Sequence, residues 1–407
     1  MRLKTARGFT IVELLIVVVV IAILAAITIV AYNGIASRAR DAQLKSDIDS
    51  AAKQLAIYNV KNGTYPTVQA SDAGVMDSAD TKFTYTYNPG DNTYCLVATN
   101  NGLTYSIAAN QTTPGQYSCV SSFAGSPSGT AGYLDATGIS ALFRSPGFLT
   151  LGADNSLYVK DGTGFPTYIR KINPTTAAVS TVYSTSTVQL QTMAVKSDGT
   201  IYATSVYPMC VNKIVTGTLS TLGSCGIMQY PAGITIGTDG NLYVVDSDNN
   251  TIDKVNPANG AVTVLAGTSS GGFADATGTS AKFNAPWGIT TGSDGNLYVA
   301  DSGNNRIRKI TLAGVVTTAA GTGGAGYVDG AIAQAQINQP VNISGDASGI
   351  LYFNDSDGRV RKLSSGTVST LAGGQTFAGG SGVSTSPTTA GVVYLDSYTG
   401  NIIYKMQ

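Results

Sequence analysis

A segment that recurs six times between residues 148 and 407 constrains the fold of this chain more than any other feature. The two most similar copies read GITIGTDGNLYVVDSDNNTIDKVNPANGAVTVLAG (233–267) and GITTGSDGNLYVADSGNNRIRKITLAGVVTTAAG (288–321). Four looser copies occupy residues 148–182, 194–223, 343–373 and, truncated, 389–407. Self-similarity at this period indicates a repeat architecture in which each copy is one supersecondary unit.

Each complete copy contains four strand-like stretches: an opening strand before a D-G turn, then L-Y-V-x-D, R-I-R-K-I and V-x-T-x-A-G. Four short strands per repeat are typical of a β-propeller blade. The motifs resemble NHL-type propeller repeats over about 280 residues, with Asn305 where that family often has histidine. The six copies therefore predict an all-β, six-bladed propeller over residues 122–407.

The last copy lacks one strand, because it stops at YKMQ before any V-x-T-x-A-G stretch. The missing pattern occurs instead in SCVSSFAG (118–125), just before the first copy. An outer strand from the front of the domain would cover the otherwise bare edge of the final blade. We therefore expect residues 118–125 to close the ring.

The N-terminal segment GFTIVELLIVVVVIAILAAITIVA (8–31) has the length of a membrane helix and contains one carboxylate, Glu13, the only glutamate in the chain. A helix over its last 23 residues would be about 35 Å long, enough to span a bilayer core of about 30 Å. Arg2, Lys4 and Arg7 precede it, which predicts a cytoplasmic N-terminus. A carboxylate inside such a helix is costly and indicates a function.

Two simpler interpretations explain less of this segment. A secretory signal has a shorter apolar region that ends at a small-x-small cleavage site, whereas here the nearest such site, 37–39, lies among charges. A plain membrane anchor fits the length but gives no reason for Glu13. Neither explains the junction between Gly8 and Phe9.

The string R-G-F-T-x-x-E-L-L-x-V-x-x-x-I-A-I-L-A resembles the leader of type IV pilins and the related pseudopilins. The resemblance implies that a membrane prepilin peptidase cleaves after Gly8 and that the new N-terminus, Phe9, is N-methylated. It also implies that Glu13 pairs with the N-terminal amine of a neighbouring pilin subunit. A buried amine needs such a partner, and a buried ion pair is well suited to fixing register.

The residues after the apolar run fit an α+β pilin module. The predictions are a leader at 1–8, one long membrane and assembly helix at 9–60, and a small antiparallel sheet at 61–121. Beyond the membrane, the helix should bury one side, made by Ile35, Leu44, Ile48, Ala51, Ala52, Leu55 and Ile57.

Four cysteines follow the apolar run, which predicts two disulfides if that part is exported. Of the three possible connectivities we favour pairing between neighbours, Cys95–Cys119 and Cys210–Cys225. Buried free thiols are the alternative.

Composition excludes several functions. The chain has no histidine, which removes Ser-His-Asp and Cys-His catalysis, histidine-dependent propeller lyases and His-ligated zinc. Its net charge is zero with only 12% charged residues, which argues against nucleic acid as a partner. We therefore expect no enzyme activity, no cofactor and no metal.

The recurring charged residues of the repeats have structural explanations. Aspartates follow the L-Y-V strand (Asp161, Asp246, Asp301, Asp355 and Asp396). They resemble calcium ligands loosely, but an aspartate that begins a turn accepts backbone N–H groups without a metal. The R-I-R-K-I cations are expected on solvated faces of outer strands, and Trp287 is expected in the core.

Long loops before copies one, four and five are the candidate ligand-binding sites, because function often lies on loops. Each carries an aromatic residue and an aspartate: Tyr133 and Asp135, Phe273 and Asp275, Tyr327 and Asp329. Packing between adjacent blades is the alternative role.

The sequence thus predicts a filament subunit, a minor or tip pilin whose propeller recognises a surface protein or a carbohydrate. It would start in the cytoplasmic (inner) membrane, with its C-terminal domains outside, and move to the pilus or cell surface. The alternatives are a pseudopilin of a type II secretion or DNA-uptake machine and, third, an enzyme displayed on a fibre.

Overall fold

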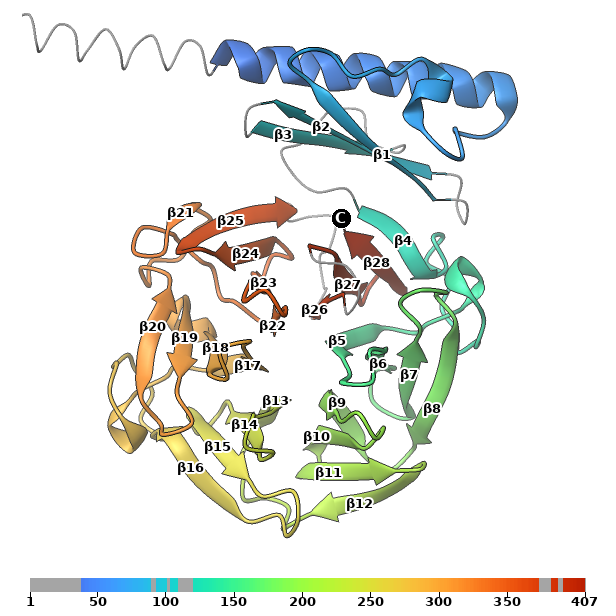
Figure 1. Ribbon diagram of the computed structural model, residues 1–407. Coiled ribbons are helices and arrows are strands. Elements are labelled where there is room, and N and C mark those ends of the chain that lie inside the picture. The colour runs from blue at the N-terminus through green and yellow to red at the C-terminus, as the bar shows by residue number, and fades with distance from the viewer. Residues whose placement is uncertain are drawn as a thin grey trace, which may run out of the picture. The chain divides into compact units, whose positions relative to one another are not determined.

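The computed structural model describes residues 38–88, 93–100, 103–108, 120–372, 382–386 and 391–406. The chain divides into two compact units. The first contains the helix at the N-terminal side and most of a three-stranded sheet, and the second contains the repeat region (Figure 1). Among the described residues, no helix is long and apolar enough to cross a membrane. The apolar run at 8–31 lies outside them.

The helix of the first unit is amphipathic over its described length, residues 38–62. Its buried side consists of Leu44, Ile48, Ala51, Ala52 and Leu55, which recur at helical spacing. Ile57, predicted for the same side, is 68% exposed, because it lies two positions after Leu55 and so falls on another side of the helix. Gly63, with φ of +75°, follows the last helical residue and provides the left-handed conformation that ends many helices.

The first unit also contains the antiparallel sheet β1-β2-β3 and a short 3₁₀ helix, η1 (Ala70–Ala73). Its strands are β1 (Lys82–Asn88), β2 (Thr93–Asn100) and β3 (Leu103–Ala108). Polar contacts join the helix to this sheet, because Tyr105 on β3 donates its hydroxyl to Asp41 and Thr81 donates to Asp47 at 2.6 Å.

The described part of the second unit contains six sheets of four or five strands, which we number 1 to 6 in chain order. Sheet 1 contains β5 (Pro146–Leu151), β6 (Leu157–Asp161), β7 (Thr167–Ile172) and β8 (Val179–Thr185). Sheet 2 contains β9 (Gln189–Val195), β10 (Ile201–Tyr207), β11 (Met209–Val215) and β12 (Thr218–Leu222). Sheet 3 contains β13 (Pro231–Ile236), β14 (Leu242–Asp246), β15 (Thr251–Val255) and β16 (Val262–Gly267).

The other three sheets follow the same order of strands. Sheet 4 contains β17 (Pro286–Thr291), β18 (Leu297–Asp301), β19 (Arg306–Ile310) and β20 (Val316–Ala320). Sheet 5 contains β21 (Gly330–Ala331), β22 (Ile343–Gly345), β23 (Leu351–Asn354), β24 (Val360–Ser364) and β25 (Thr367–Ala372). Sheet 6 contains β26 (Val383–Thr385), β27 (Val393–Ser397), β28 (Ile402–Met406) and β4 (Val120–Gly125).

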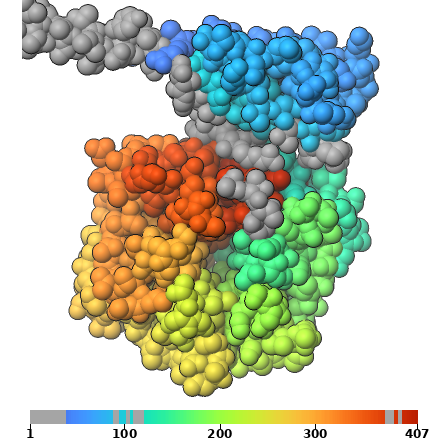
Figure 2. Space-filling model, viewed as in Figure 1, coloured from blue at the N-terminus to red at the C-terminus, as the bar shows by residue number. Residues whose placement is uncertain are grey.

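The six sheets surround a common centre in a propeller-like arrangement (Figure 1), and they follow one another in chain order around the face seen in Figure 2. The inner strands are β5, β9, β13, β17, β22 and β26. Sheet 6 begins earlier than the sequence indicated, since its inner strand is β26, before residue 389. Its outer strand is β4, which pairs with β28 from Val120↔Met406 to Gly125↔Ile402.

Apolar side chains fill the space between neighbouring sheets. Between sheets 3 and 4, Tyr243 and Val245 pack with Leu297, Val299 and Phe283, all of them buried. Trp287, expected in the core, is partly buried against this cluster. Because both faces of each sheet are covered in this way, the loops and hairpins at the ends of the strands are the positions left for recognition.

Candidate functional site

The three loops with a predicted ligand-binding role join the outer strand of one sheet to the inner strand of the next. They comprise residues 126–145, 268–285 and 322–342, which precede β5, β17 and β22. The first two contain short 3₁₀ helices, η2 (Gly138–Ser140) and η3 (Gly278–Ser280). Isolated bridges such as Leu134↔Leu142 and Ala274↔Lys282 fold these two loops back on themselves.

A buried arginine holds the loop before sheet 4. Arg308 on β19 is 0% exposed, and it donates to Asp301 at 2.7 Å and to Asp275 at 2.6 Å. The same guanidinium donates to the carbonyl oxygens of Lys282 at 3.0 Å and Ala274 at 2.9 Å. We call this arrangement of an arginine, a strand aspartate and a loop aspartate the arginine clasp. It joins the loop to the strands through charged hydrogen bonds.

The clasp occurs in three sheets, each of which is preceded by a long loop. The other two clasps are Arg170 with Asp161 (2.9 Å) and Asp135 (2.8 Å), and Arg361 with Asp355 (2.9 Å) and Asp329 (2.8 Å). Both arginine side chains are 0% exposed. The sequence interpretation that placed these cations on solvated faces is therefore wrong, because each third strand is packed on both sides.

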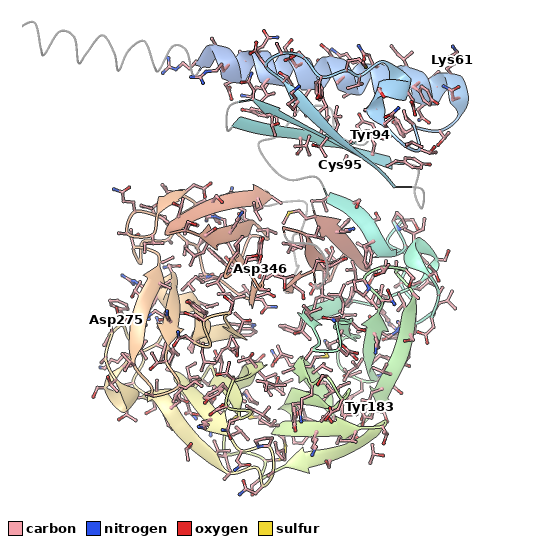
Figure 3. All side chains as sticks on the ribbon, in the orientation of Figure 1. Lys61, Tyr94, Cys95, Tyr183, Asp275 and Asp346 are labelled. Atoms are coloured by element: carbon pink, nitrogen blue, oxygen red, sulfur yellow. A yellow bond between two sulfur atoms is a disulfide. The ribbon has the colours of Figure 1, made fainter. Side chains whose placement is uncertain are left out.

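The loop aspartates also bind the neighbouring outer strand. In sheet 4, Thr318 on β20 donates its backbone N–H to Asp275 at 3.0 Å and its hydroxyl at 3.2 Å. Figure 3 labels Asp275 at the outer edge of this sheet. Thr181 and Thr370 donate in the same way to Asp135 and Asp329. The structure thus gives all three loop aspartates partners within their own sheets, and a ligand-binding role for them stays a prediction.

Burial and hydrogen bonding shift the pKa values of the clasp carboxylates in opposite directions. Burial raises the pKa of Asp161 and of Asp355 to about 6, although hydrogen bonds and the charges of Arg170 and Arg361 oppose it. Burial also favours a higher pKa for Asp135, but the hydrogen bonds from Thr181 and Arg170 have the larger effect, and the pKa of Asp135 is lowered.

The predicted aromatic residues of the loops pack on side chains of their own sheets. Tyr133 stacks on Tyr168 with ring centroids 4.2 Å apart. The guanidinium of Arg306 lies 3.9 Å from the ring centroid of Phe273, and that of Arg359 lies 3.7 Å from that of Tyr327. Such cation–π contacts stabilise the loops. The ligand-binding role of Tyr133, Phe273 and Tyr327 also stays a prediction.

An asparagine links each loop to the preceding sheet, a contact that the sequence did not predict. The side-chain oxygens of Asn401, Asn250 and Asn305 accept the N–H groups of Ser145 (2.7 Å), Ala285 (2.7 Å) and Gln339 (2.9 Å). All three asparagines have φ between 53° and 54°, a conformation that asparagine tolerates better than most residues. These bonds fix the hairpins on which they lie.

Sheets without a long loop have other residues in place of the clasp. In sheet 2, Asn212 donates to Ser205 at 2.9 Å. In sheet 3, Asp253 occupies the position that the arginine has in the clasps. It lies near Asp246 and is 4% exposed. Ser397, not Asp396, ends the second strand of sheet 6. Arginine and loop aspartate therefore occur together, and this correlation among the repeats is the signal that could have revealed the clasp.

A cavity of about 540 Å³ lies at the centre of the six sheets and is lined by their inner strands. Among the described residues that line it, Lys196 is the charged one. Hydroxyl groups there bond to the neighbouring sheet: Thr291 donates to the carbonyl oxygen of Ile236 at 2.9 Å, and Thr385 to that of Gly345 at 3.2 Å. These bonds hold neighbouring sheets together around the cavity.

The disulfide Cys210–Cys225 is confirmed and joins β11 to the segment before β13. Cys95 is also disulfide-bonded, but Cys119 lies outside the described residues, so its pairing stays a prediction. Gly8, Phe9 and Glu13 lie outside them as well. Within the described ranges, no three Asp, Glu, Cys or His side chains come together as a metal-binding group.

Comparison with known proteins identifies both parts of the chain. Residues 3–29 match the prokaryotic N-terminal methylation motif, and residues 228–254 and 283–310 match the NHL repeat. Two proteins match over shorter stretches: Protein SUPPRESSOR OF QUENCHING 1, chloroplastic, of Arabidopsis thaliana (37% identity over 91 residues) and NHL repeat-containing protein 2 of Bos taurus (35% over 105). The alignments cover 22% and 25% of this chain but only 9% and 14% of those proteins.

Solved structures support the propeller-like fold. A structural genomics protein of unknown function from Bacteroides thetaiotaomicron aligns with a TM-score of 0.56 and 19% identity, over 80% of this chain and 90% of that one. An auxiliary nutrient binding protein from the same organism aligns with a TM-score of 0.54 and 18% identity, over 77% and 83%. At such identities the likeness shows the fold alone.

The pilin segment has a relative that it covers almost completely. The chain is 33% identical over 109 residues to the type IV wide pilus major component of Thermus thermophilus, which is 26% of this chain but 83% of that protein. With the methylation motif at its N-terminus and NHL repeats in its propeller-like unit, the chain belongs to the type IV pilin family.

Proposed function

We propose that this pilin is a minor or tip subunit of a type IV pilus that presents a propeller for adhesion to a surface ligand. The observation that carries the proposal is the presence, in one chain, of an N-terminal methylation motif (3–29) and a propeller-like unit made of NHL repeats. In this proposal the segment with the methylation motif assembles into the filament, and the propeller-like unit provides loops and hairpins for recognition.

In this proposal the N-terminal segment works as in other pilins. Prepilin peptidase cleaves after Gly8, and the methylated amine of Phe9 pairs with Glu13 of a neighbouring subunit. The pair compensates two charges that would each be unfavourable alone in an apolar environment. The subunit waits in the inner membrane before assembly, with the region after the helix outside.

The head is proposed to be a six-bladed propeller over residues 122–407 together with the preceding part of β4. Six sheets whose inner strands line one cavity support this number of blades. The pairing of β4 with β28 supports a closed ring. A head of this size on every subunit would crowd a filament, which favours a minor component.

The head is proposed to bind its ligand without catalysis. The chain has no histidine to act as a general base. The strand carboxylates of the clasps are 0% exposed and bonded to arginines, so a ligand on the surface does not reach them.

Mass spectrometry of the mature protein, beside a Glu13→Ala variant, tests the assembly role. We expect a chain that starts at methylated Phe9, and a variant that is processed normally but is absent from sheared filaments. Thr10→Ala, a neutral change in the same segment, serves as the control and should assemble. A mature chain that starts at Met1, or a Glu13→Ala protein still found in filaments, contradicts the proposal.

The composition of sheared filaments tests the minor role. If this chain forms the bulk of the filament, the minor or tip role is wrong. If it is recovered only with the cell envelope under conditions that yield pili, the pseudopilin alternative is favoured.

A further inference from the structure

Exposed aromatic side chains are concentrated on the hairpins of three neighbouring sheets. The hairpins formed by the second and third strands of sheets 6, 1 and 2 carry Tyr398, Phe165 and, as the last residue of β10, Tyr207. These side chains are 37%, 47% and 65% exposed. The connections between the same two strands in sheets 3, 4 and 5 read SDNN (247–250), SGNN (302–305) and SDGR (356–359) and have no aromatic residue. These three hairpins are therefore polar and the first three aromatic, and on the side of the polar hairpins an exposed aromatic ring, Phe273, lies on the loop before sheet 4.

Two of these rings are in contact and keep open faces. Phe165 and Tyr207 meet edge to face, with centroids 6.2 Å apart and ring planes at 76°. This arrangement leaves ring surface accessible, as their exposure shows. Met209 and Ile227 extend the apolar surface beside Tyr207 and are 40% and 52% exposed. We call Tyr398, Phe165, Tyr207, Met209 and Ile227 the aromatic arc.

The hairpins that carry the arc are held in place. The disulfide Cys210–Cys225 and a bond from the N–H of Gly226 to the carbonyl oxygen of Met209 (2.9 Å) fix the end of the arc in sheets 2 and 3. Asn401 fixes the hairpin of Tyr398 by accepting the N–H of Ser145 and donating to the carbonyl oxygen of Gly129 at 2.9 Å. A surface ordered before binding loses less entropy on binding.

The arc carries no charge of its own. None of the segments 162–168, 206–211, 223–230 and 398–401 contains Asp, Glu, Lys or Arg. Exposed Arg144, which interacts with Tyr133 beside Tyr168, is a charged side chain at their margin. On these segments themselves a charged ligand would lose water without gaining a partner of opposite charge. Electrostatic complementarity therefore favours a neutral ligand.

The size of the arc selects among neutral ligands. Its partly exposed side chains present on the order of 400 Å², which is about half of what a stable protein–protein interface buries on each partner. A sugar chain fits such a surface better. The C–H faces of sugar rings stack on aromatic rings, while sugar hydroxyls pair with tyrosine hydroxyls and backbone groups.

We propose that the aromatic arc is a binding site for a neutral oligosaccharide, which lies across the hairpins of sheets 6, 1 and 2. This rests on the proposed function in one respect, namely that the head binds a surface ligand. It adds the class of ligand and the residues that contact it, and it places the site away from the clasped loops of sheets 4 and 5.

Binding of the purified full-length chain, in detergent, to an array of neutral and charged oligosaccharides tests the site. The neutral probes are hexamers of glucose, galactose and N-acetylglucosamine, and the charged probes are sialylated and sulfated chains. We expect binding to at least one neutral hexamer. Tyr207→Ala and Phe165→Ala should each weaken it about tenfold or more. Tyr207→Phe keeps the stacking ring and should bind within about threefold of the parent.

Val264→Ala is the matched control, because Val264 is similarly exposed, 50%, but lies on the outer strand β16 of sheet 3. It should keep full binding. No binding to any neutral hexamer, a preference for the charged chains, or unchanged binding of both alanine variants overturns the proposal. So does capture of a folded protein through the arc in place of a sugar.

The two proposals can fail separately. If Tyr207→Ala pili contain the protein and still adhere, the oligosaccharide site is wrong and the adhesive pilin stands. If the protein is absent from pili while the purified chain binds a neutral hexamer through Tyr207, the site stands and the pilin role fails.

Discussion

The third strand of each sheet has one position, opposite the middle of the second strand, whose side chain differs from sheet to sheet. The residue at this position pairs with the third residue of the second strand, as Arg308 does with Val299 and Asp253 with Val244. In chain order, the six residues at this position are Arg170, Asn212, Asp253, Arg308, Arg361 and Tyr404. The repeat thus keeps one backbone and changes its buried polar chemistry by single residues.

Asp253 is the unfavourable member of this set. Burial raises its pKa to about 7, the nearby charge of Asp246 acts in the same direction, and a hydrogen bond from Thr251 opposes both. The oxygen Oδ1 of Asp253 is buried and has no hydrogen-bond partner. The folded state therefore keeps a proton on Asp253 up to about pH 7, whereas the unfolded chain loses it near pH 3.8.

We expect the free energy of unfolding to fall as the pH rises from about 4 to about 7, because the folded state binds the additional proton over this range. Asp253→Asn should remove the part of this dependence that Asp253 causes, while Asp161 and Asp355, whose pKa values burial also raises, keep theirs. It should stabilise the protein above pH 7 by on the order of 2 kcal/mol, with little effect near pH 4. Urea unfolding at both pH values measures it. Asp248→Asn, an exposed change in the hairpin between β14 and β15, should have no such effect, and an equal gain there would contradict the role of Asp253.

At the scale of the element, the arginine clasp determines how a long loop is attached. In sheet 4 the loop, the end of β18 and the outer strand β20 all meet the Arg308–Asp275–Asp301 group. The loop is thereby fixed at its middle and not only at its ends. We infer that a blade can carry a long loop only where this group is present.

Replacing Arg308 by Met should destabilise the head by about 3–5 kcal/mol, because Asp301 would remain buried without a cation. Lys309→Met is the matched control on the same strand, since Lys309 pairs with Asp294 at a partly exposed site. Its loss should cost at most about 1 kcal/mol. Unfolding in urea, followed by circular dichroism, separates the two, and similar costs for both variants would refute a structural role of the clasp.

Much of the element structure could be predicted from the sequence because its signals are local. The D-G turns and the L-Y-V strands indicate the hairpins of the complete copies, and the structure has strands there, such as β14 and β18. The buried arginines could not be predicted from alternation alone. Both faces of a propeller strand pack against neighbouring sheets, so alternation does not separate core from solvent, and Arg308 looked like a surface residue.

The candidate site was only partly predictable for a related reason. The sequence shows which loops are long, but not whether Asp275 faces outward or toward a buried partner on β19. The aromatic arc joins residues of sheets 6, 1 and 2 that are far apart in the chain, and only the arrangement of the sheets brings Phe165 to Tyr207.

At the scale of the whole molecule, the pairing of β4 with β28 joins the two ends of the repeat region. Ala124 on β4 is fully buried in the cluster between sheets 6 and 1, with Phe143 and Tyr394. The pairing of β4 thus completes sheet 6, which packs against sheet 5 on one face and sheet 1 on the other. A destabilising substitution in β4 should therefore lower the stability of the whole repeat region.

Ala124→Asp buries an unpaired carboxylate and should destabilise the head by several kcal/mol. Because the ring is closed, the fluorescence of Trp287, which lies in sheet 4, should report the same lowered urea midpoint as circular dichroism. Ser121→Asp, on the same strand but only partly buried, should change the midpoint little. An unchanged Trp287 midpoint in Ala124→Asp would mean that sheet 6 unfolds independently of sheet 4.

The position of β4 has a mechanical consequence for a pilin. Tension transmitted along the backbone from the filament enters the repeat region at Val120, whose partner is Met406 near the other end of the chain. The first interstrand bonds to be loaded are thus those that close the ring. The force that this ladder withstands therefore sets the tension at which the repeat region begins to open.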